Sequence, residues 1–357
     1  MCINYATKRG TTLLMAPLAL AAAVSSVAQA AEVKLPETTL TASMRSSFAY
    51  TQFDGTTDDK ADFNLDSLSL YINGKITDNV KFSFSSEIIS DRVVVQDAIA
   101  QFEFDPKFNI WAGRLLAPTD RANSYGAYFS NNWNFYADGV QDAYPSVSLG
   151  RSDGVVYWGD FADTKLKVSA GLFDIPATKG LNKTMAAARV QYDFWDAEPG
   201  YYINGTYLGE KDILALGVAA NAVDSDKAAN IDFLMEKKVG AGGAFTVEAS
   251  YLTHDGLPSD YQPNYTSGDG YYGLVAYLFP QAIGPGKVQV LAKFGTSKFE
   301  DGPTADFDVD TAEFNVNYII KSFNARVSLF AKDSSSSDDA IQEGSSTVGL
   351  GVQLMTL

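Results

Sequence analysis

Apolar and polar residues alternate in the stretch Leu68-Ser69-Leu70-Tyr71-Ile72-Asn73-Gly74-Lys75-Ile76. Successive side chains of a β-strand point to opposite faces. The leucine and isoleucine side chains of this stretch therefore share one face, and the serine, tyrosine, asparagine and lysine side chains share the other. The same rhythm returns, in segments closed by turn residues, from Ser43 to the end of the chain. The pattern predicts an all-β protein whose strands are apolar on one face and polar on the other.

Sixteen segments follow this alternation, and we expect sixteen strands. They lie near residues 43–53, 65–76, 80–90, 95–105, 108–115, 153–161, 165–174, 184–195, 211–221, 228–238, 244–254, 269–279, 287–299, 306–320, 323–333 and 344–355. Their connections alternate between tight turns and longer polar loops, a pattern typical of transmembrane barrels. Residues 200–209 also look strand-like, but a seventeenth strand would put every later tight turn on the wrong rim. We therefore assign residues 196–210 to an elaborated connection.

The first thirty residues have the features of an export signal. Lys8 and Arg9 supply the charge, Leu13 to Val27 forms an apolar stretch, and Ala28-Gln29-Ala30 is a small-residue cleavage site. The apolar stretch is shorter than the roughly 20 residues that a spanning helix needs. We expect residues 1–30 to be removed and the mature protein to reach the cell outer membrane.

The mature chain is predicted to be a single domain. A short periplasmic segment, residues 31–42, precedes a 16-stranded antiparallel transmembrane β-barrel at residues 43–357. The apolar strand faces would contact lipid and the polar faces would surround a water-filled lumen. An aromatic content of 13% suits girdles of aromatic residues at both membrane surfaces. The alternative that the strand pattern leaves open is a secreted soluble β-sandwich or solenoid.

Composition argues against several other classes of protein. The 27 basic and 43 acidic residues give a formal charge of −16, which disfavours binding to nucleic acid. The one cysteine, Cys2, lies in the predicted signal, and His254 is the one histidine, so we expect no Cys/His metal cage and no cofactor. A hydrolase built on His254 is the enzymatic alternative, but a lone histidine at a predicted strand-to-loop edge is far more often a solvated loop residue. We predict that the protein is not an enzyme.

The longest predicted connection, residues 116–152, is the main candidate for a functional segment. Connections of this length are uncommon unless they are functional or disordered. Its aromatic residues, from Tyr125 to Tyr136, argue against disorder. We expect charged residues of this loop and of the strands to line the narrowest part of the lumen: Asp120, Arg121, Asp138 and Asp142 in the loop, and Glu87, Glu103, Arg114, Arg151, Arg189 and Arg326 on or beside the strands. The alternative is a loop that only caps the outer rim.

Three motifs resemble those of a known family. They are the stretch at 68–76, Trp111-Ala112-Gly113-Arg114-Leu115-Leu116-Ala117-Pro118 at the entry to the long loop, and Gly150-Arg151-Ser152-Asp153-Gly154-Val155 at its exit. Together they make the chain similar to the phosphate-selective porin O and P family of Gram-negative bacteria. The resemblance implies a trimeric outer-membrane channel of sixteen strands whose third loop folds into the lumen of each pore.

The charge balance differs from what phosphate selectivity requires. In that family, selectivity depends on fixed arginines and lysines that attract anions into a narrow path. This chain lacks the corresponding enrichment in basic residues, so we expect a general or weakly cation-preferring channel for the passive diffusion of small hydrophilic solutes and ions. The expected partners are outer-membrane lipid, lipopolysaccharide and two further copies of the chain. An anion-selective or phosphate-selective channel and a plugged structural or adhesive barrel are the alternatives.

Overall fold

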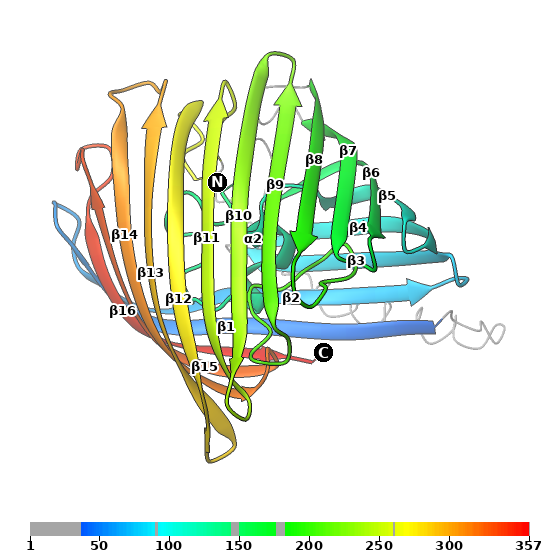
Figure 1. Cartoon of the computed structure of the whole chain (residues 1–357). Coiled ribbons are helices and arrows are strands. Elements are labelled where there is room, and N and C mark those ends of the chain that lie inside the picture. Colours follow the sequence, from blue (N-terminus) through cyan, green and yellow to red (C-terminus); the bar gives the residue numbers. More distant parts are fainter. Residues whose placement is uncertain (1–36, 90–91, 144–149, 176–182, 260, 357) are drawn as a thin grey trace, which may run out of the picture. The chain divides into compact units, whose positions relative to one another are not determined.

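The strands close into a barrel (Figure 1). The computed structural model describes residues 37–89, 92–143, 150–175, 183–259 and 261–356. The sixteen strands of these residues are β1 Glu37–Phe53, β2 Lys60–Lys75, β3 Val80–Ile89, β4 Arg92–Asp105, β5 Phe108–Leu116, β6 Arg151–Phe161, β7 Leu166–Ile175, β8 Lys183–Asp193, β9 Ile213–Val223, β10 Asp226–Val239, β11 Gly243–Asp255, β12 Ser267–Ile283, β13 Gly286–Glu300, β14 Phe307–Lys321, β15 Ala325–Ser336 and β16 Ser345–Met355. Between β5 and β6 lie two short helical turns, α2 Arg121–Tyr125 and η1 Ala127–Phe129.

Each strand neighbours the strands that precede and follow it in sequence, and β1 pairs antiparallel with β16 to complete the ring. The predicted fold class, an antiparallel barrel of sixteen strands, is confirmed for the described residues. Strand β1 begins at Glu37, so part of the segment predicted to precede the barrel belongs to its first strand. The predicted signal, residues 1–30, lies outside the described residues.

The connection between β8 and β9, residues 194–212, contains no strand. This agrees with the prediction that residues 196–210 form an elaborated connection. Because β5 and β8 run in opposite directions, this connection starts from the opposite rim to the loop that follows β5.

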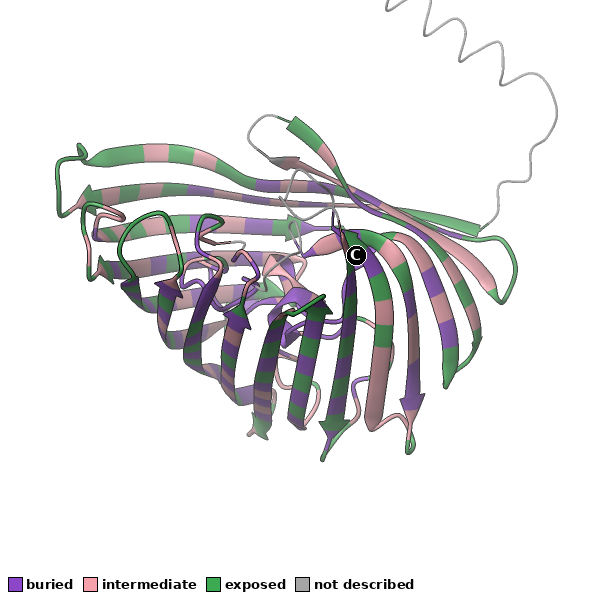
Figure 2. Ribbon diagram, turned by 90° about the horizontal axis from the view of Figure 1, so that it is seen from above, coloured by how far each residue is buried: buried purple, intermediate pink, exposed green. Residues whose placement is uncertain are grey.

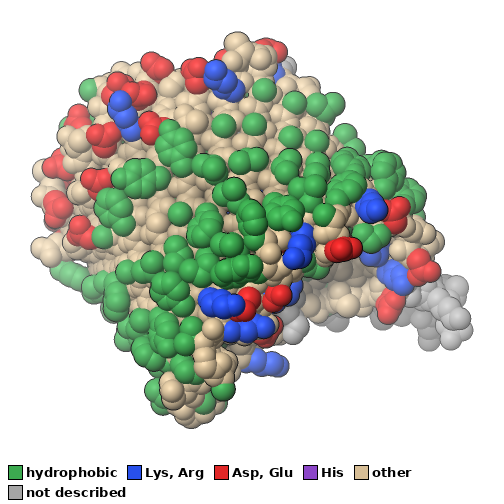
Figure 3. Space-filling view, in the orientation of Figure 1, with side chains coloured by type: hydrophobic (Ala, Val, Ile, Leu, Met, Phe, Trp, Pro, Cys, Tyr) green, Lys and Arg blue, Asp and Glu red, His purple; other side chains and the backbone are tan. Residues whose placement is uncertain are grey.

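Burial alternates along the strands with a period of two residues (Figure 2). On β2, Ser69 is buried while Leu70 is exposed, and on β13 Lys293 is buried while Phe294 is exposed. On the face drawn in Figure 3, the exposed side chains form an apolar belt, and charged groups gather towards the ends of the strands. Belt residues from around the barrel include Leu172, Val190, Val218, Val275, Phe294, Phe314, Leu329 and Leu350. The polar set of each strand therefore faces inward.

Aromatic pairs on the outer face follow the rim that carries the short turns. The centroid of the Phe108 ring lies 5.7 Å from the ring centroids of both Phe104 and Tyr157. Tyr277 and Phe279 form a similar pair at 4.9 Å. Tyrosine and phenylalanine at such a rim suit the boundary between hydrocarbon and water.

Within the described residues, no helix is long and apolar enough to cross a membrane.

A charge in the outer belt should destabilise the barrel in lipid. Leu172 is 55% exposed on the outer face of β7, and Leu172→Arg should lower the free energy of unfolding from lipid vesicles by about 2–4 kcal/mol. Asp174→Arg, two residues nearer the end of the same strand, is the control and should cost about 0–1 kcal/mol. Denaturant titration in vesicles measures both. Equal effects of the two variants would show that the belt does not face hydrocarbon.

Candidate functional site

The loop segment, which we define as residues 117–143 after β5, makes hydrogen bonds to inner-face side chains of many strands. Its Trp133 N–H donates to Asn315 Oδ1 on β14 at 2.8 Å, and its Tyr125 hydroxyl donates to Glu248 on β11 at 2.6 Å. Its Tyr128 hydroxyl donates to Ser67 Oγ on β2 at 2.8 Å. These strands belong to different sides of the ring, so the loop segment contacts the inner wall at widely separated points.

Trp133 is the best-anchored residue of the loop segment. The Arg45 guanidinium lies 4.2 Å from the centroid of its ring, and Phe330 stacks on it at 5.8 Å with an interplanar angle of 8°. A Cβ atom on Gly351 would lie 2.3 Å from the Trp133 ring, so only glycine leaves room for the indole there. Cation–π attraction and close packing thus hold the loop segment against β1, β15 and β16.

A second segment, the connecting segment at residues 194–212, contacts the loop segment. The Arg121 guanidinium donates to both oxygens of Glu198, at 2.9 and 2.5 Å, and both side chains are almost fully buried. The Tyr207 hydroxyl adds a hydrogen bond to Glu198 at 2.6 Å. Burial alone would raise the pKa of Glu198, but the charge and hydrogen bonds of Arg121 hold that pKa below its usual value.

Backbone hydrogen bonds also join the two segments. The Gly205 N–H donates to the Phe129 carbonyl at 3.1 Å, and the Asn131 side chain donates to the Gly205 carbonyl at 3.1 Å. The Ile203 N–H donates to the Ser124 carbonyl at 3.4 Å. Two chain segments that start from opposite rims therefore form one hydrogen-bonded unit.

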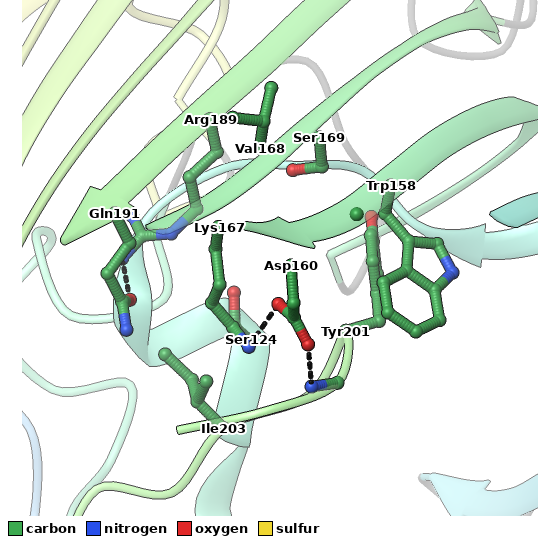
Figure 4. Close-up of a pocket in the computed structure, with 12 residues that line it drawn as sticks. Ser124, Trp158, Asp160, Lys167, Val168, Ser169, Arg189, Gln191, Tyr201 and Ile203 are labelled. Carbon is green, nitrogen blue, oxygen red and sulfur yellow. Dashed lines mark hydrogen bonds and ion pairs between the residues drawn. The ribbon is translucent and has the colours of Figure 1, made fainter. Parts of the chain in front are cut away.

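A cavity of about 20 Å³ lies beside this unit (Figure 4). Lys167 on β7 is 3.3 Å from Asp160 on β6, and the Gly200 N–H donates to the other oxygen of Asp160 at 2.7 Å. Tyr201 and Arg189 also line the cavity. A space of this size holds about one water molecule, so this cavity is too small to be a passage for solutes.

Arg189 ties the loop segment to the wall on the same side. It donates to both oxygens of Asp232 on β10 and, at 3.1 Å, to the Thr119 carbonyl. The Arg121 N–H also donates to Asp232, at 3.1 Å. Burial first, and then the charge of Asp232, raises the pKa of the nearby Asp120 to about 7.

Most of the charged residues predicted to line a lumen are engaged in these contacts. Asp138 is buried and lies 2.6 Å from Lys293, and Arg326 donates to the Ser130 carbonyl at 2.7 Å. The predicted candidates that are buried are Asp120, Arg121, Asp138, Asp142, Arg189 and Arg326. Arg121, Asp138, Arg189 and Arg326 join the loop segment to the wall or to the connecting segment, whereas Asp120 accepts the Asp142 N–H within the loop segment.

Three other predicted candidates line the wall between β3 and β6. Glu87 accepts a hydrogen bond from Gln96 at 2.7 Å and another from Ser67. Glu103 lies 2.5 Å from Lys81, and Arg151 lies 3.3 Å from Asp97. These groups are partly exposed.

Arg114 is a correction, because the structure places it on the outer face. It pairs with Asp153 at 2.7 Å, and both side chains are largely exposed. Its neighbours on that face of β5 are Ile110 and Ala112, which have the same parity as Arg114 along the strand. The alternation of inward and outward side chains along β5 would by itself have predicted this outward position.

Sequence reasoning did not single out Glu198, Asp232 or Glu313. Glu313 accepts the Trp133 N–H at 3.2 Å, in addition to Asn315. Asp232 and Glu313 are carboxylates at inward positions of predicted strands, and this position could have identified them as partners of the loop. Glu198 lies in a connection that has no periodic pattern, so the sequence carried no signal for its role.

His254 lies at the end of β11, and its Nδ1 donates to the Leu257 carbonyl at 2.8 Å and to the Thr266 carbonyl at 3.2 Å. These contacts order the following loop, which explains a buried histidine at this rim.

No protein-family model matches the sequence, and no curated protein matches it either. Solved structures do match the fold. OprB of Pseudomonas putida has a TM-score of 0.64 at 10% identity, over 89% of this chain and 94% of that one. An anion-selective porin from Comamonas acidovorans has a TM-score of 0.56 at 13% identity, over 90% and 99%. The trimer form of OmpT, an outer membrane protein of Vibrio cholerae, has a TM-score of 0.55 at 15% identity, over 89% and 99%. The chain is similar in fold to Gram-negative outer-membrane proteins, including porins.

Glu198→Gln should destabilise the folded barrel, because it leaves the Arg121 guanidinium buried without a carboxylate. Removal of one partner of a buried pair costs about 3–5 kcal/mol. Glu210→Gln, an exposed change in the same connecting segment, is the matched control and should cost less than about 0.5 kcal/mol. The temperature at which the detergent-folded barrel loses its compact electrophoretic form measures both. Equal temperatures would contradict the structural role of the pair.

Asp120 should make stability depend on pH. Its pKa is about 7 in the folded protein against a usual 3.8, so the folded state holds one more proton than the unfolded chain between about pH 4 and 7. Its contribution to stability is therefore greatest at acid pH, falls as the pH rises across this window, and is level above it. Melting temperatures of the wild type minus those of Asp120→Asn should fall from pH 5 to pH 7. Asp163→Asn, in an exposed turn, is the control, and parallel curves for the wild type and Asp120→Asn would refute the shift.

Proposed function

We propose that this protein is an outer-membrane porin through which small hydrophilic solutes and ions diffuse passively. The observation that carries the proposal is a closed ring of strands with an apolar outer belt and a polar inner face. A ring without edges satisfies its backbone hydrogen bonds in lipid, and a polar interior admits water. Neighbours of the same fold are described as porins and outer membrane proteins.

We infer that the loop segment lies in the lumen and narrows it. Its hydrogen bonds to β2, β11 and β14 support this, since only a segment inside the ring reaches all three. We infer that the remaining water-filled space runs along the inner face of β2 to β4. There Asn73 is exposed, and Lys81 and Glu103 keep 38% and 21% of their side-chain surface accessible.

The charges along this space favour a weak cation preference. Lys81 and Arg151 are each paired with a carboxylate, Glu103 and Asp97 respectively. In the described part of the chain, the hydrogen-bond partners of Glu87 are the neutral side chains of Ser67 and Gln96. Glu87 therefore adds negative charge to the path. Anion or phosphate selectivity, as the resemblance to the phosphate-selective family would suggest, is the second candidate, and one neighbour of the same fold is named as anion-selective.

We also propose that the protein forms trimers, as the trimer form of the Vibrio cholerae neighbour does. Exposed acidic residues of the loops, such as Asp301 and Asp306, would face lipopolysaccharide through bridging divalent ions.

Conductance tests the proposed function. Purified protein should give stepwise conductance in planar bilayers, with a reversal potential in a KCl gradient that shows mild cation preference. Glu87→Gln should lower the K⁺/Cl⁻ permeability ratio by about twofold, the scale of one screened charge in water. Arg114→Ala, a charge change on the outer face, is the control and should leave the ratio unchanged. Insertion without any conductance steps would indicate a plugged barrel instead.

A further inference from the structure

Four aromatic rings form one cluster on the inner face of β5 and β6. Trp111 on β5 is buried, and its ring centroid lies 5.6 Å from that of Trp158 on β6. Tyr201 and Tyr202 of the connecting segment contact the Trp111 ring at 5.0 and 5.6 Å. The two tyrosine rings also contact each other, at 5.5 Å. We call these four residues the aromatic cluster.

The aromatic cluster lies away from the rim at which the connecting segment starts. Trp111 is three residues before the outward Arg114, so its side chain points inward. The Tyr201 hydroxyl donates to the carbonyl of Leu116, the last residue of β5, at 2.7 Å. That end of β5 belongs to the opposite rim, so the connecting segment reaches along the inner face of β5. Tyr202, which contacts Trp111 and is 41% exposed, therefore has its accessible surface on the inner side of the wall.

Polar side chains continue from the aromatic cluster along the wall. The Trp111 Nε1–H donates to Glu103 Oε1 on β4 at 3.2 Å, and the other oxygen of Glu103 lies 2.5 Å from Lys81 Nζ on β3. Gln101 is half-buried and lies opposite both Lys81 and Trp111 in the strand register. We call Lys81, Gln101 and Glu103 the polar row. Because Lys81 and Glu103 neutralise each other, the polar row offers hydrogen-bond donors and acceptors without a net charge.

The aromatic cluster is fixed before any solute arrives. Glu103 holds the Trp111 indole, and Leu116 holds the Tyr201 phenol. Tyr201 lies beside Trp158 (Figure 4), with 6.3 Å between their ring centroids. Tyr202 rests on these anchored rings, so little side-chain freedom remains to be lost when a solute binds to its open face.

We propose that the aromatic cluster and the polar row together form a binding site for sugars. A sugar ring has an apolar face of C–H groups and a rim of hydroxyl groups that both donate and accept hydrogen bonds. Tyr202 presents an aromatic face to the C–H groups, and the polar row bonds the hydroxyl groups. Ions gain less, because the charges of Lys81 and Glu103 already neutralise each other. This inference rests on the proposed function and names one class of solute for it.

Block of the ion current by maltotriose, a neutral trisaccharide, tests the proposal. In planar bilayers, maltotriose should reduce the current of wild-type channels along a saturating curve. Tyr202→Leu should raise the half-blocking concentration about fivefold, the scale of one lost aromatic contact, and Tyr202→Phe should retain the wild-type value. Lys81→Met/Glu103→Gln keeps the polar row neutral but removes its ammonium donors, and it should also raise the half-blocking concentration about fivefold.

Tyr192→Leu is the matched control, because Tyr192 is also 41% exposed but lies on the outer face. It should keep the wild-type half-blocking concentration. Polyethylene glycol of the same size as maltotriose controls for simple exclusion of ions, and its effect should neither saturate nor depend on Tyr202. Maltotriose that acts only as this polymer does would overturn the inference. A lower half-blocking concentration for phosphate than for maltotriose would also overturn it.

Tryptophan fluorescence separates this inference from the proposed function. Trp111 and Trp158 belong to the aromatic cluster, so the fluorescence of the detergent-folded barrel should change along a saturating curve as maltotriose is added. The half-saturating concentration should rise about fivefold in Tyr202→Leu. Normal conductance without a saturable fluorescence change would overturn the sugar site alone. A saturable change in a protein that never conducts would refute the proposed function and retain the binding site.

Discussion

Pairing of the backbone is the constraint on which the rest of this structure depends. In hydrocarbon an unpaired N–H or C=O group costs several kcal/mol, and only a sheet closed on itself leaves no edge. The pairing of β1 with β16, from Ser43 with Met355 to Phe53 with Ser345, completes the ring. Once the ring is closed, each strand must place one face outside and one inside. The alternation of apolar and polar residues along the chain follows from that requirement.

A polar inner face changes how a segment can be held there. Hydrogen bonds, ion pairs and stacking on Trp133 hold the loop segment. Buried ion pairs add little net stability but penalise any arrangement that separates them. Arg121 with Glu198 and Arg189 with Asp232 are pairs of this kind. They fix the position of the loop segment and of the connecting segment together.

The sequence predicted the strands well because alternation is a local property, visible within ten residues. Alternation predicted the strand count, the inward position of polar residues such as Ser69, and the absence of a strand in residues 196–210. The partners of the loop segment could not be predicted from alternation. Glu198 and Glu313 are distant from it in sequence and come into contact with it only when the barrel closes. Arg114 points outward because it shares the parity of Ile110 and Ala112 on β5. The packing of the loop segment against the connecting segment decides which charged side chains face water. Alternation along the strands carries no information about this packing.

The long sequence separation of these contacts sets an order of events during assembly. Trp133 and Asn315 are 182 residues apart, and Ser130 and Arg326 are 196 residues apart. The loop segment cannot reach its final neighbours before β14 and β15 have joined the sheet, and contacts so distant in sequence form slowly. The last strands of the chain are therefore the template on which this early segment settles.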